Sequence, residues 1–365
     1  MRAFIVTPDF EPALEAELSA DCHPRRPAWP GVVICDGVAP DAPDAPVDPV
    51  DPIFARQTLP DAIQLVAPSA QRLAEAAYTA IADRIDEAAA AGPFTLHAFA
   101  WPPAPALGSR VELVGRQLLE LLKERRRRAF RSYRPCPSAS LIPGAPDVTT
   151  AAFDLREPGA SLVQLLALDR ERMLISTARP RPLPRGGTDL APWLAGSAPV
   201  AADRSAPSRA YQKLEEAFHW LGEAPAPGQT CVDLGGAPGG WAWTALKRGA
   251  QVTAVDRAPL ERPAAGHARL TGLIGNAFTF EAAHPVDWLL CDVVCEPARS
   301  LAVIARWLER GWCRQMVVTV KFKGRDGYRI LDGIAPLFAG AGWRFVRTKQ
   351  LLHNKDEVTV LARER

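Results

Sequence analysis

The sequence predicts an α/β fold in which a doubly wound C-terminal domain follows a smaller α+β half. From about residue 208 onward, short apolar runs alternate with helical patterns in a regular β-α-β order. These runs are apolar almost throughout, as strands are when helices cover both faces of a mostly parallel sheet. The earlier half alternates strands and helices less regularly and is interrupted by Pro-rich stretches, which indicates separate small modules.

The N-terminal half is expected to contain these elements in chain order: strand 3–7, helix 12–19, strand 31–35, strand 62–66, helix 70–91, strand 94–99, helix 110–131 and two strands within 161–177. Residues 39–52 (APDAPDAPVDPVDP) have a composition that cannot bury a core, so we expect an exposed, extended loop there. The Pro/Arg/Gly-rich residues 178–187 indicate a domain boundary.

Six strands are predicted in the C-terminal half, with helical patterns between most of them: 230–234, 252–256, 288–292, 316–321, 343–350 and 357–362. The short polar link LLHNKD joins the last two, which allows an antiparallel hairpin at the edge of the sheet.

The chain length of 365 residues exceeds one typical core, so two or three domains are expected. Because the formal net charge is only +2, affinity for nucleic acid would need a local basic patch. The seven cysteines include no CxxC pair, which predicts reduced thiols rather than a zinc site or a disulfide framework. The absence of a signal peptide and of any apolar run of about 20 residues predicts a cytoplasmic protein without a membrane anchor.

Three charged residues fall where strands of the predicted sheet begin or end, and a fourth lies on a nearby helix. Asp292 ends one apolar run, Lys321 ends the next, Glu357 opens the last, and Lys213 lies on a helix ahead of the first. Because open α/β sheets bind ligands at the carboxyl ends of their strands, we expect these side chains to converge. For each residue alone, surface ion pairing is the commoner outcome. Their joint placement favours a catalytic set.

This set predicts alkyl transfer to a hydroxyl oxygen. A hydroxyl is a weak nucleophile, so its proton must leave as the alkyl group arrives. We assign Lys321 as the general base, expecting burial and the neighbouring Lys213 to lower its pKa. Asp292 and Glu357, with Lys213, would orient it and balance its charge, and no metal is needed. Cys295, three residues after Asp292, raises a cysteine nucleophile as a rival, but a structural thiol is the expected outcome there and at Cys136.

Residues 232–241 (VDLGGAPGGW) have the form of a strand, a glycine-rich turn and a helix start. Glycines allow a ligand to approach the backbone closely, and Asp256 ends the next strand at the spacing where a carboxylate meets a ribose diol. Pro238 breaks the GxGxxG pattern of dinucleotide-binding domains. S-adenosylmethionine, which has a ribose and a carboxylate that can sit on a helix N-terminus, also fits. A tight turn without a ligand is the alternative.

Several segments resemble the FtsJ-like RNA ribose 2′-O-methyltransferases, and most of all the RlmM family, which methylates a cytidine ribose in bacterial 23S ribosomal RNA. They are PSRAYQKLEEAF, DLGGAPGGW, VDRAP, LLCDVVCEPAR, WLERGWCR, VVTVKF and HNKDEVTV. The resemblance covers roughly residues 208–365 and includes the spacing of the Lys-Asp-Lys-Glu set. It is weaker in the N-terminal half, where FARQTLP (54–60) is similar.

The resemblance implies a Rossmann-like methyltransferase domain at 188–365, with a mostly parallel seven-stranded sheet and an antiparallel edge strand. It implies a ferredoxin-like domain at 1–67 and a THUMP-like RNA-binding domain at 68–187. It also implies an S-adenosylmethionine site. Residues of that site, by correspondence with the family, are Ser208, Gly235, Ala237, Pro238, Gly239, Gly240, Asp256 for the ribose, Asn276 facing adenine, and Asp292 beside the methyl group. Asn276 replaces the acidic residue that the family often has, so we expect a changed affinity.

The segment KERRRRAFRSYR (123–134) is the predicted RNA contact. Arginines neutralise phosphates and aromatic rings stack on unpaired bases. The predicted contact residues are Arg125, Arg126, Arg127, Arg128, Phe130, Arg131 and Tyr133. A solvated charged face is the alternative.

The function predicted from the sequence is methyl transfer from S-adenosylmethionine to a ribose 2′-hydroxyl, with 23S ribosomal RNA or a ribosome-assembly intermediate as partner and a monomeric state. One alternative keeps the donor and changes the acceptor to another RNA or a protein. The other is a non-catalytic RNA-binding assembly factor.

Overall fold

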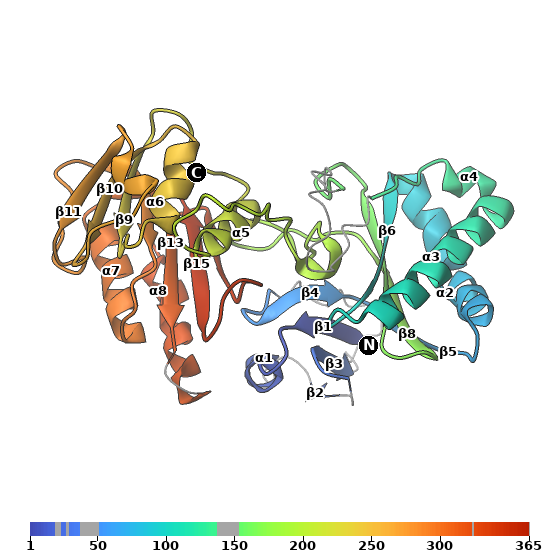
Figure 1. The fold of residues 1–365 in the computed structure, drawn as a ribbon. Coiled ribbons are helices and arrows are strands. Elements are labelled where there is room, and N and C mark those ends of the chain that lie inside the picture. Colours follow the sequence, from blue (N-terminus) through green and yellow to red (C-terminus); the bar gives the residue numbers. More distant parts are fainter. Residues whose placement is uncertain (19–22, 27–28, 37–50, 137–152, 323–324, 365) are drawn as a thin grey trace. The chain divides into compact units, whose positions relative to one another are not determined.

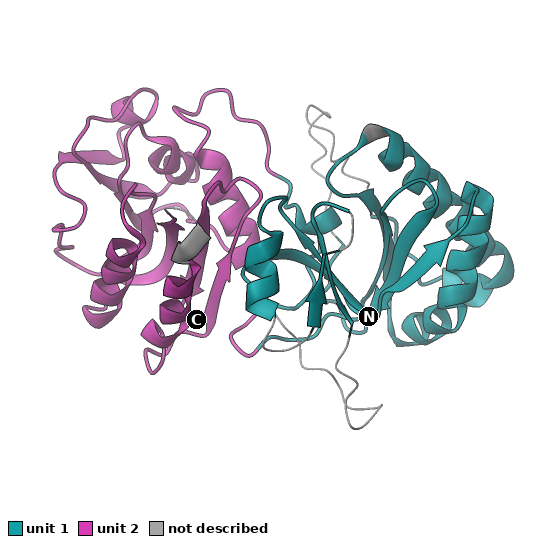
Figure 2. Ribbon diagram, turned by 90° about the horizontal axis from the view of Figure 1, so that it is seen from below, with its two compact units in different colours: residues 1–183, 187–199 teal, residues 184–186, 200–365 magenta. Residues whose placement is uncertain are grey.

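The computed structural model describes residues 1–18, 23–26, 29–36, 51–136, 153–322 and 325–364. Two compact units divide the chain: residues 1–183 with 187–199, and residues 184–186 with 200–365 (Figure 2). The expected Pro/Asp-rich loop falls almost entirely outside the described residues. The three-domain division and the names ferredoxin-like and THUMP-like remain predictions.

The N-terminal unit contains two four-stranded sheets (Figure 1). Its elements are β1 (Arg2–Val6), α1 (Glu11–Leu18), β2 (His23–Arg25), β3 (Val32–Asp36), β4 (Ala55–Leu59), β5 (Ile63–Val66), α2 (Ala70–Ala91), β6 (Phe94–Ala100), α3 (Pro105–Arg125), α4 (Arg127–Phe130), β7 (Ser161–Ala167), β8 (Arg172–Ala178) and the 3₁₀ turn η1 (Leu194–Gly196). The first sheet has the order β2-β3-β1-β4 and is antiparallel. The second has the order β5-β8-β7-β6, with only β6 and β7 parallel.

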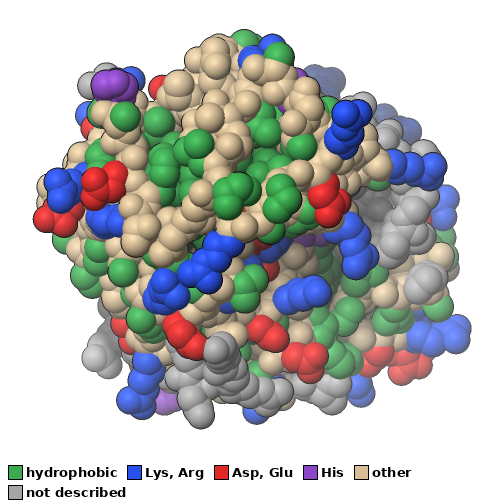
Figure 3. Space-filling model, turned by 60° about the vertical axis from the view of Figure 1, so that its left-hand side comes forward, with side chains coloured by type: hydrophobic (Ala, Val, Ile, Leu, Met, Phe, Trp, Pro, Cys, Tyr) green, Lys and Arg blue, Asp and Glu red, His purple; other side chains and the backbone are tan. Residues whose placement is uncertain are grey.

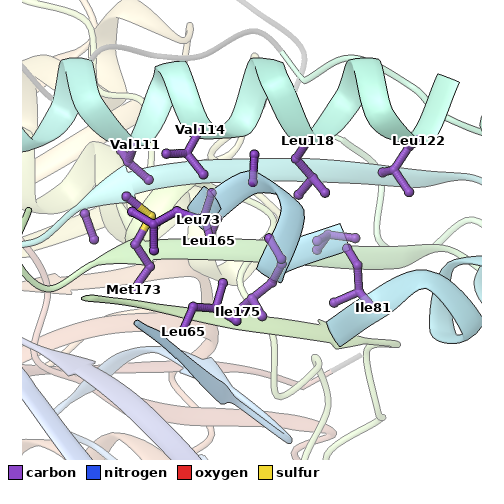
Figure 4. Close-up of a cluster of buried hydrophobic side chains, with 14 of the residues drawn as sticks. Leu65, Leu73, Ile81, Val111, Val114, Leu118, Leu122, Leu165, Met173 and Ile175 are labelled. Carbon is purple, nitrogen blue, oxygen red and sulfur yellow. The ribbon is translucent and has the colours of Figure 1, made fainter. Parts of the chain in front are cut away.

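Helices α2 and α3 cover one face of the second sheet and bury an apolar cluster. Val111, Val114, Leu118 and Leu122 repeat at helical spacing on α3 and are at most 2% exposed. Figure 4 shows their side chains pointing from α3 toward the strands, where Ile175 belongs to the same cluster. The repeat gives α3 one apolar face.

The C-terminal unit contains one seven-stranded sheet with the order β11-β10-β9-β12-β13-β15-β14. Its elements are α5 (Tyr211–Leu221), β9 (Thr230–Leu234), α6 (Gly240–Lys247), β10 (Gln251–Asp256), η2 (Ala264–Gly266), β11 (Leu270–Ile274), β12 (Val286–Cys291), α7 (Pro297–Glu309), β13 (Cys313–Lys321), η3 (Arg325–Gly333), α8 (Ile334–Leu337), β14 (Phe345–Lys349) and β15 (Glu357–Arg363). This is the predicted doubly wound fold.

The order of strands reverses between β9 and β12. From β9 the chain passes through α6 to β10 on one side, and from β12 it passes through α7 to β13 on the other. Right-handed crossovers in opposite directions place α6 and α7 on opposite faces of the sheet (Figure 1). The carboxyl ends of β9 and β12, beside this reversal, are the usual ligand position in this architecture.

The predicted antiparallel edge strand is wrong in its position. The hairpin of β14 and β15 exists, but β15 lies between β13 and β14, so that β14 forms the edge. A hairpin pattern in the sequence does not show which of its two strands pairs with the rest of the sheet. Strand β11, at the other edge, was not among the six strands predicted from apolar runs, because it lacks a buried face, with Ile274 70% exposed.

Two further predictions for the N-terminal unit need correction. The helix expected over 110–131 is interrupted at Arg126, whose φ of −130° and ψ of 47° separate α3 from α4. The expectation of seven reduced thiols is wrong for Cys35, which is disulfide-bonded. Disulfide formation depends on distance in the fold, which sequence spacing alone does not give. The free cysteines among the described residues are Cys136, Cys231, Cys291, Cys295 and Cys313.

Candidate functional site

Four charged side chains of the C-terminal unit meet at one edge of the sheet. Asp292 directly follows β12, and Lys321 is the last residue of β13. Glu357 is the first residue of β15 and lies opposite Lys321 in the antiparallel ladder. Because β15 runs against its neighbours, its first residue lies beside the last residues of the parallel strands. Lys213 reaches the same point from α5, so the predicted convergence is present.

The four side chains form a closed ring of alternating charge. Lys213 Nζ donates to Asp292 Oδ2 at 2.7 Å and to Glu357 Oε1 at 3.0 Å. Lys321 Nζ donates to Asp292 Oδ1 at 2.6 Å and to Glu357 Oε2 at 2.8 Å. Each carboxylate thus uses one oxygen for each lysine. All four side chains are at most 17% exposed, so solvent screens these charges only weakly.

The ring fixes the protonation states of two members. Burial opposes ionisation of Asp292, but the ammonium groups of Lys321 and Lys213 outweigh it and hold the pKa of that carboxyl below its usual range. Burial also disfavours the charged form of Lys321, yet the carboxylates of Asp292 and Glu357 raise its pKa above the ordinary value. The expectation that Lys213 and burial lower the pKa of Lys321 is therefore wrong for the resting site.

Two residues beside the ring were not singled out from the sequence. Thr319 is fully buried on β13, and its Oγ1 donates to Asp292 Oδ1 at 2.8 Å. Asp233 on β9 is also fully buried; burial and the charge of Asp292 raise its pKa to about 8. A proton on Asp233 at neutral pH leaves Asp292 as the charged carboxyl beside β9. Side chains alternate between the two faces of a strand, so Thr319, two residues before Lys321, lies on the same face as that lysine. This spacing could have identified Thr319 from the sequence.

The glycine-rich turn after β9 has little room for side chains. Gly235 has φ +79°, and a Cβ there would lie 2.6 Å from the side chain of Val293. Gly239 has φ +121°, which a residue with a Cβ rarely adopts. A Cβ at Gly240 would lie 2.5 Å from Ser208 Oγ, an atom that is buried and has no hydrogen-bond partner among the described residues. The predicted Ser208 is therefore brought against the start of α6.

Asp256 lies at the end of β10 and supports the same turn. Its Oδ2 accepts from the Ala237 amide at 3.1 Å and its Oδ1 from the Ala258 amide at 3.0 Å. The carbonyl of Pro238 accepts from the Glu261 amide. Each carboxylate oxygen has a second lone pair, so the predicted contact with a ribose is compatible with these bonds. Asn276 follows β11, and its Oδ1 accepts from the Phe278 amide at 3.1 Å.

The predicted RNA-contact residues lie on α3, α4 and the turn after them, in the N-terminal unit. Arg127, Arg128 and Arg131 are exposed. Arg126 instead forms ion pairs with Asp86 at 3.2 Å and with Asp83 at 3.9 Å. The exposed arginines keep their charge available to a partner, whereas that of Arg126 is partly compensated.

The two aromatic residues of the segment are half-buried. The rings of Phe130 and Tyr133 stack on each other with centroids 5.2 Å apart, and both pack against the apolar cluster under α3. Burial raises the pKa of the Tyr133 hydroxyl. Arg125 lies over the ring of Tyr78, at 5.3 Å from its centroid. Only the exposed parts of the Phe130 and Tyr133 rings are accessible for base stacking.

Within the described ranges, no group of three or more His, Cys, Asp or Glu side chains could hold a metal ion. Across the same ranges, no helix has the length and apolar content that crossing a membrane requires. The Sγ of Cys295 is hydrogen-bonded with Ser300 Oγ at 3.3 Å, and burial raises the pKa of the Cys291 thiol to about 12.

The substitution Asp292→Asn should lower the pKa of Lys321, because asparagine preserves the shape of the ring but removes one of two carboxylates that favour the ammonium form. Titration of ¹³Cε-labelled lysines by NMR measures this directly. Asp287→Asn is the matched control, since Asp287 lies at the other end of β12 and bonds to Thr230. An unchanged Lys321 titration in Asp292→Asn would show that the ring does not set its charge.

Residues 206–309 match the family model described as FtsJ-like methyltransferase. The chain is 38% identical over 217 residues to the ribosomal RNA large subunit methyltransferase M of Laribacter hongkongensis, covering 56% of this chain and 60% of that protein. It is 40% identical over 178 residues to the protein of the same name from Ectopseudomonas mendocina, covering 46% of this chain and 51% of that protein.

The chain thus spans about half to three-fifths of the length of these curated relatives. The family match and the Rossmann-like α/β sheet agree with the resemblance inferred from the motifs. The residues that match the FtsJ-like methyltransferase family model lie within the C-terminal unit.

Proposed function

We propose that this protein transfers a methyl group from S-adenosylmethionine to a ribose 2′-hydroxyl of large-subunit ribosomal RNA. The ring of Lys213, Asp292, Lys321 and Glu357 carries the proposal, because it places two amines and two carboxylates at the ligand-binding edge of the sheet. The name shared by the curated relatives supports ribosomal RNA as the acceptor. A cytidine of 23S RNA, as acceptor, and a cytoplasmic location remain predictions from the sequence.

The glycine-rich turn has the features that the methyl donor would need. The unpartnered Ser208 Oγ can donate to a carboxylate, and the amides at the start of α6 favour a negative group. Gly235 and Gly239 carry no side chains of their own, and their positive φ angles shape the turn. Asp256 would hold the ribose hydroxyls. When bound, the donor supplies a sulfonium methyl group, which needs no further activation.

Lys321 is the proposed general base. Its raised pKa means that the ring holds it as an ammonium in the resting site, so it must first lose a proton. A positive charge brought beside Asp292 would weaken the attraction between that carboxylate and Lys321, and would lower the pKa of the lysine. Lys213 and Glu357 would keep the amine aimed at the acceptor hydroxyl, so that positioning contributes to the rate.

We infer that the N-terminal unit contributes RNA contacts through Arg127, Arg128 and Arg131. Side chains of both signs are interspersed on the face drawn in Figure 3, in keeping with the net charge of +2, so RNA binding needs a local basic patch. Exposed arginines next to a helix end provide one. A THUMP-like character for this unit would agree with that role.

The substitution Lys321→Ala should reduce methyl transfer at least about a hundredfold while leaving S-adenosylmethionine affinity nearly unchanged, because it removes the base but not the turn. Transfer of labelled methyl into purified 23S RNA, with ribonuclease mapping and nucleoside analysis, measures the first, and calorimetry measures the second. Lys247→Met is the control, because it removes a lysine of α6 that is paired with Asp203.

Full activity in Lys321→Ala would exclude this base. Donor binding without turnover in the wild-type protein would instead favour a non-catalytic assembly factor. Label found on a base, a protein or another RNA would change the acceptor.

The substitution Arg128→Glu should weaken RNA binding and reduce the slope of log affinity against log salt by about one, because it removes a phosphate contact. Filter binding at several salt concentrations measures both quantities. Arg156→Glu changes the net charge equally at a site 84% exposed in the same unit, paired with Asp154, and serves as the control. Equal behaviour of the two variants would exclude α4 as part of the RNA-binding surface.

A further inference from the structure

Glu216 is a buried carboxylate that the proposed chemistry does not use. It lies on α5, three residues after Lys213, and is 1% exposed. A buried carboxylate is costly unless hydrogen bonds replace its water. The side chain therefore needs partners within the protein, and the structure provides them from a segment far away in sequence.

The partners of Glu216 are two successive backbone amides in the loop between β14 and β15. Its Oε1 accepts from the Leu352 amide at 2.9 Å and its Oε2 from the His353 amide at 3.1 Å. Hydrogen bonds to an ionised acceptor are about twice as strong as neutral ones. Glu216 thus holds this loop to α5 at two consecutive points.

The loop leads directly into the catalytic strand. The next residue, Asn354, is 7% exposed, and its Nδ2 donates to the Glu357 carbonyl and to Thr359 Oγ1, both at 3.1 Å. Glu357 begins β15 three residues later. The position of Glu357 is therefore connected to α5 through a short segment, in which the Leu352 and His353 amides and the Asn354 side chain are hydrogen-bonded.

We propose that Glu216 is a positioning residue for the ring. One turn of α5 supplies Lys213 to Glu357 and also fixes, through Glu216, the loop from which Glu357 emerges. This double attachment sets the separation between Lys213 and Glu357. It thereby sets the orientation of the Lys321 amine, which is bonded to Glu357. This inference rests on the proposed methyl transfer, and it adds a residue that acts only through the ring.

The neighbouring Glu215 provides a matched comparison. It lies on the same helix but forms an ion pair with Arg248, which directly follows α6 and is not part of the ring. A substitution at Glu215 changes the charge of α5 equally and leaves the β14–β15 loop untouched. Glu215→Gln therefore separates loss of helix charge from loss of the loop attachment.

The substitution Glu216→Gln preserves the size of the side chain but leaves it only one acceptor for two amides. We expect amide hydrogen exchange at Leu352 and His353 to become about tenfold faster, the equivalent of one lost hydrogen bond. We expect kcat for methyl transfer to fall about tenfold or more, with the affinity for S-adenosylmethionine and the KM for RNA nearly unchanged. Glu216→Asp, which keeps the charge and both oxygens, should recover part of kcat, and Glu215→Gln should match the wild type.

Each result bears on a different step. Unchanged exchange at both amides in Glu216→Gln overturns the loop attachment. Faster exchange with unchanged kcat overturns the positioning role. If Glu216→Gln does not fold, wild-type exchange decides, because rapid exchange of these two amides would exclude the attachment. A wild-type protein without methyl transfer refutes the proposed function, while the exchange comparison still tests the attachment.

Discussion

The alternation of charge around a closed ring is the constraint on which the C-terminal unit depends. Its four members come from α5, the end of β12, the end of β13 and the start of β15, so the ring closes only when all four elements are in register. Removing one partner of a buried ion pair leaves an uncompensated charge, at a cost of about 3–5 kcal/mol. An intact buried pair adds little net stability by comparison. The ring therefore specifies positions more than it stabilises the fold.

The fold supports the ring from several directions. The reversal of strand order between β9 and β12 lies beside Asp292, which directly follows β12. Insertion of β15 against β13 places Glu357 directly across from Lys321, which parallel pairing would not do. Thr319 orients Asp292 through a hydrogen bond. Because the pKa of the neighbouring Asp233 is raised, its carboxyl adds no second negative charge beside Asp292 at neutral pH. The glycine-rich turn lies one strand away, so donor and base would share one edge of the sheet.

Most of this arrangement could be predicted from the sequence. The strand ends at Asp292 and Lys321 and the strand start at Glu357 are visible as boundaries of apolar runs, and these boundaries were enough to predict the convergence. The glycine-rich turn and Asp256 were equally visible, since their spacing follows from one βαβ unit. Local sequence patterns show where strands begin and end, and the strand order brings the residues at these ends together.

What the sequence did not show depends on tertiary neighbours. The predicted direction of the pKa shift of Lys321 was wrong. Two carboxylates lie within hydrogen-bonding distance of its amine, and their charges outweigh the effect of burial. The place of β15 inside the sheet depends on long-range pairing, and β11 has no buried face to mark it. Phe130 and Tyr133 were predicted to stack on RNA bases because they lie in a basic segment, yet they pack against the core of their own unit. The bonds of Glu216 join residues 136 and 137 positions apart.

The pH dependence of kcat/KM for S-adenosylmethionine tests the central claim most directly. This quantity reports ionisations of the enzyme before the donor binds. If the ring holds Lys321 as an ammonium with a raised pKa, the reactive amine should increase about tenfold for each pH unit between about pH 7 and pH 9. The account predicts that kcat/KM rises in parallel. A rate independent of pH over that range would contradict it.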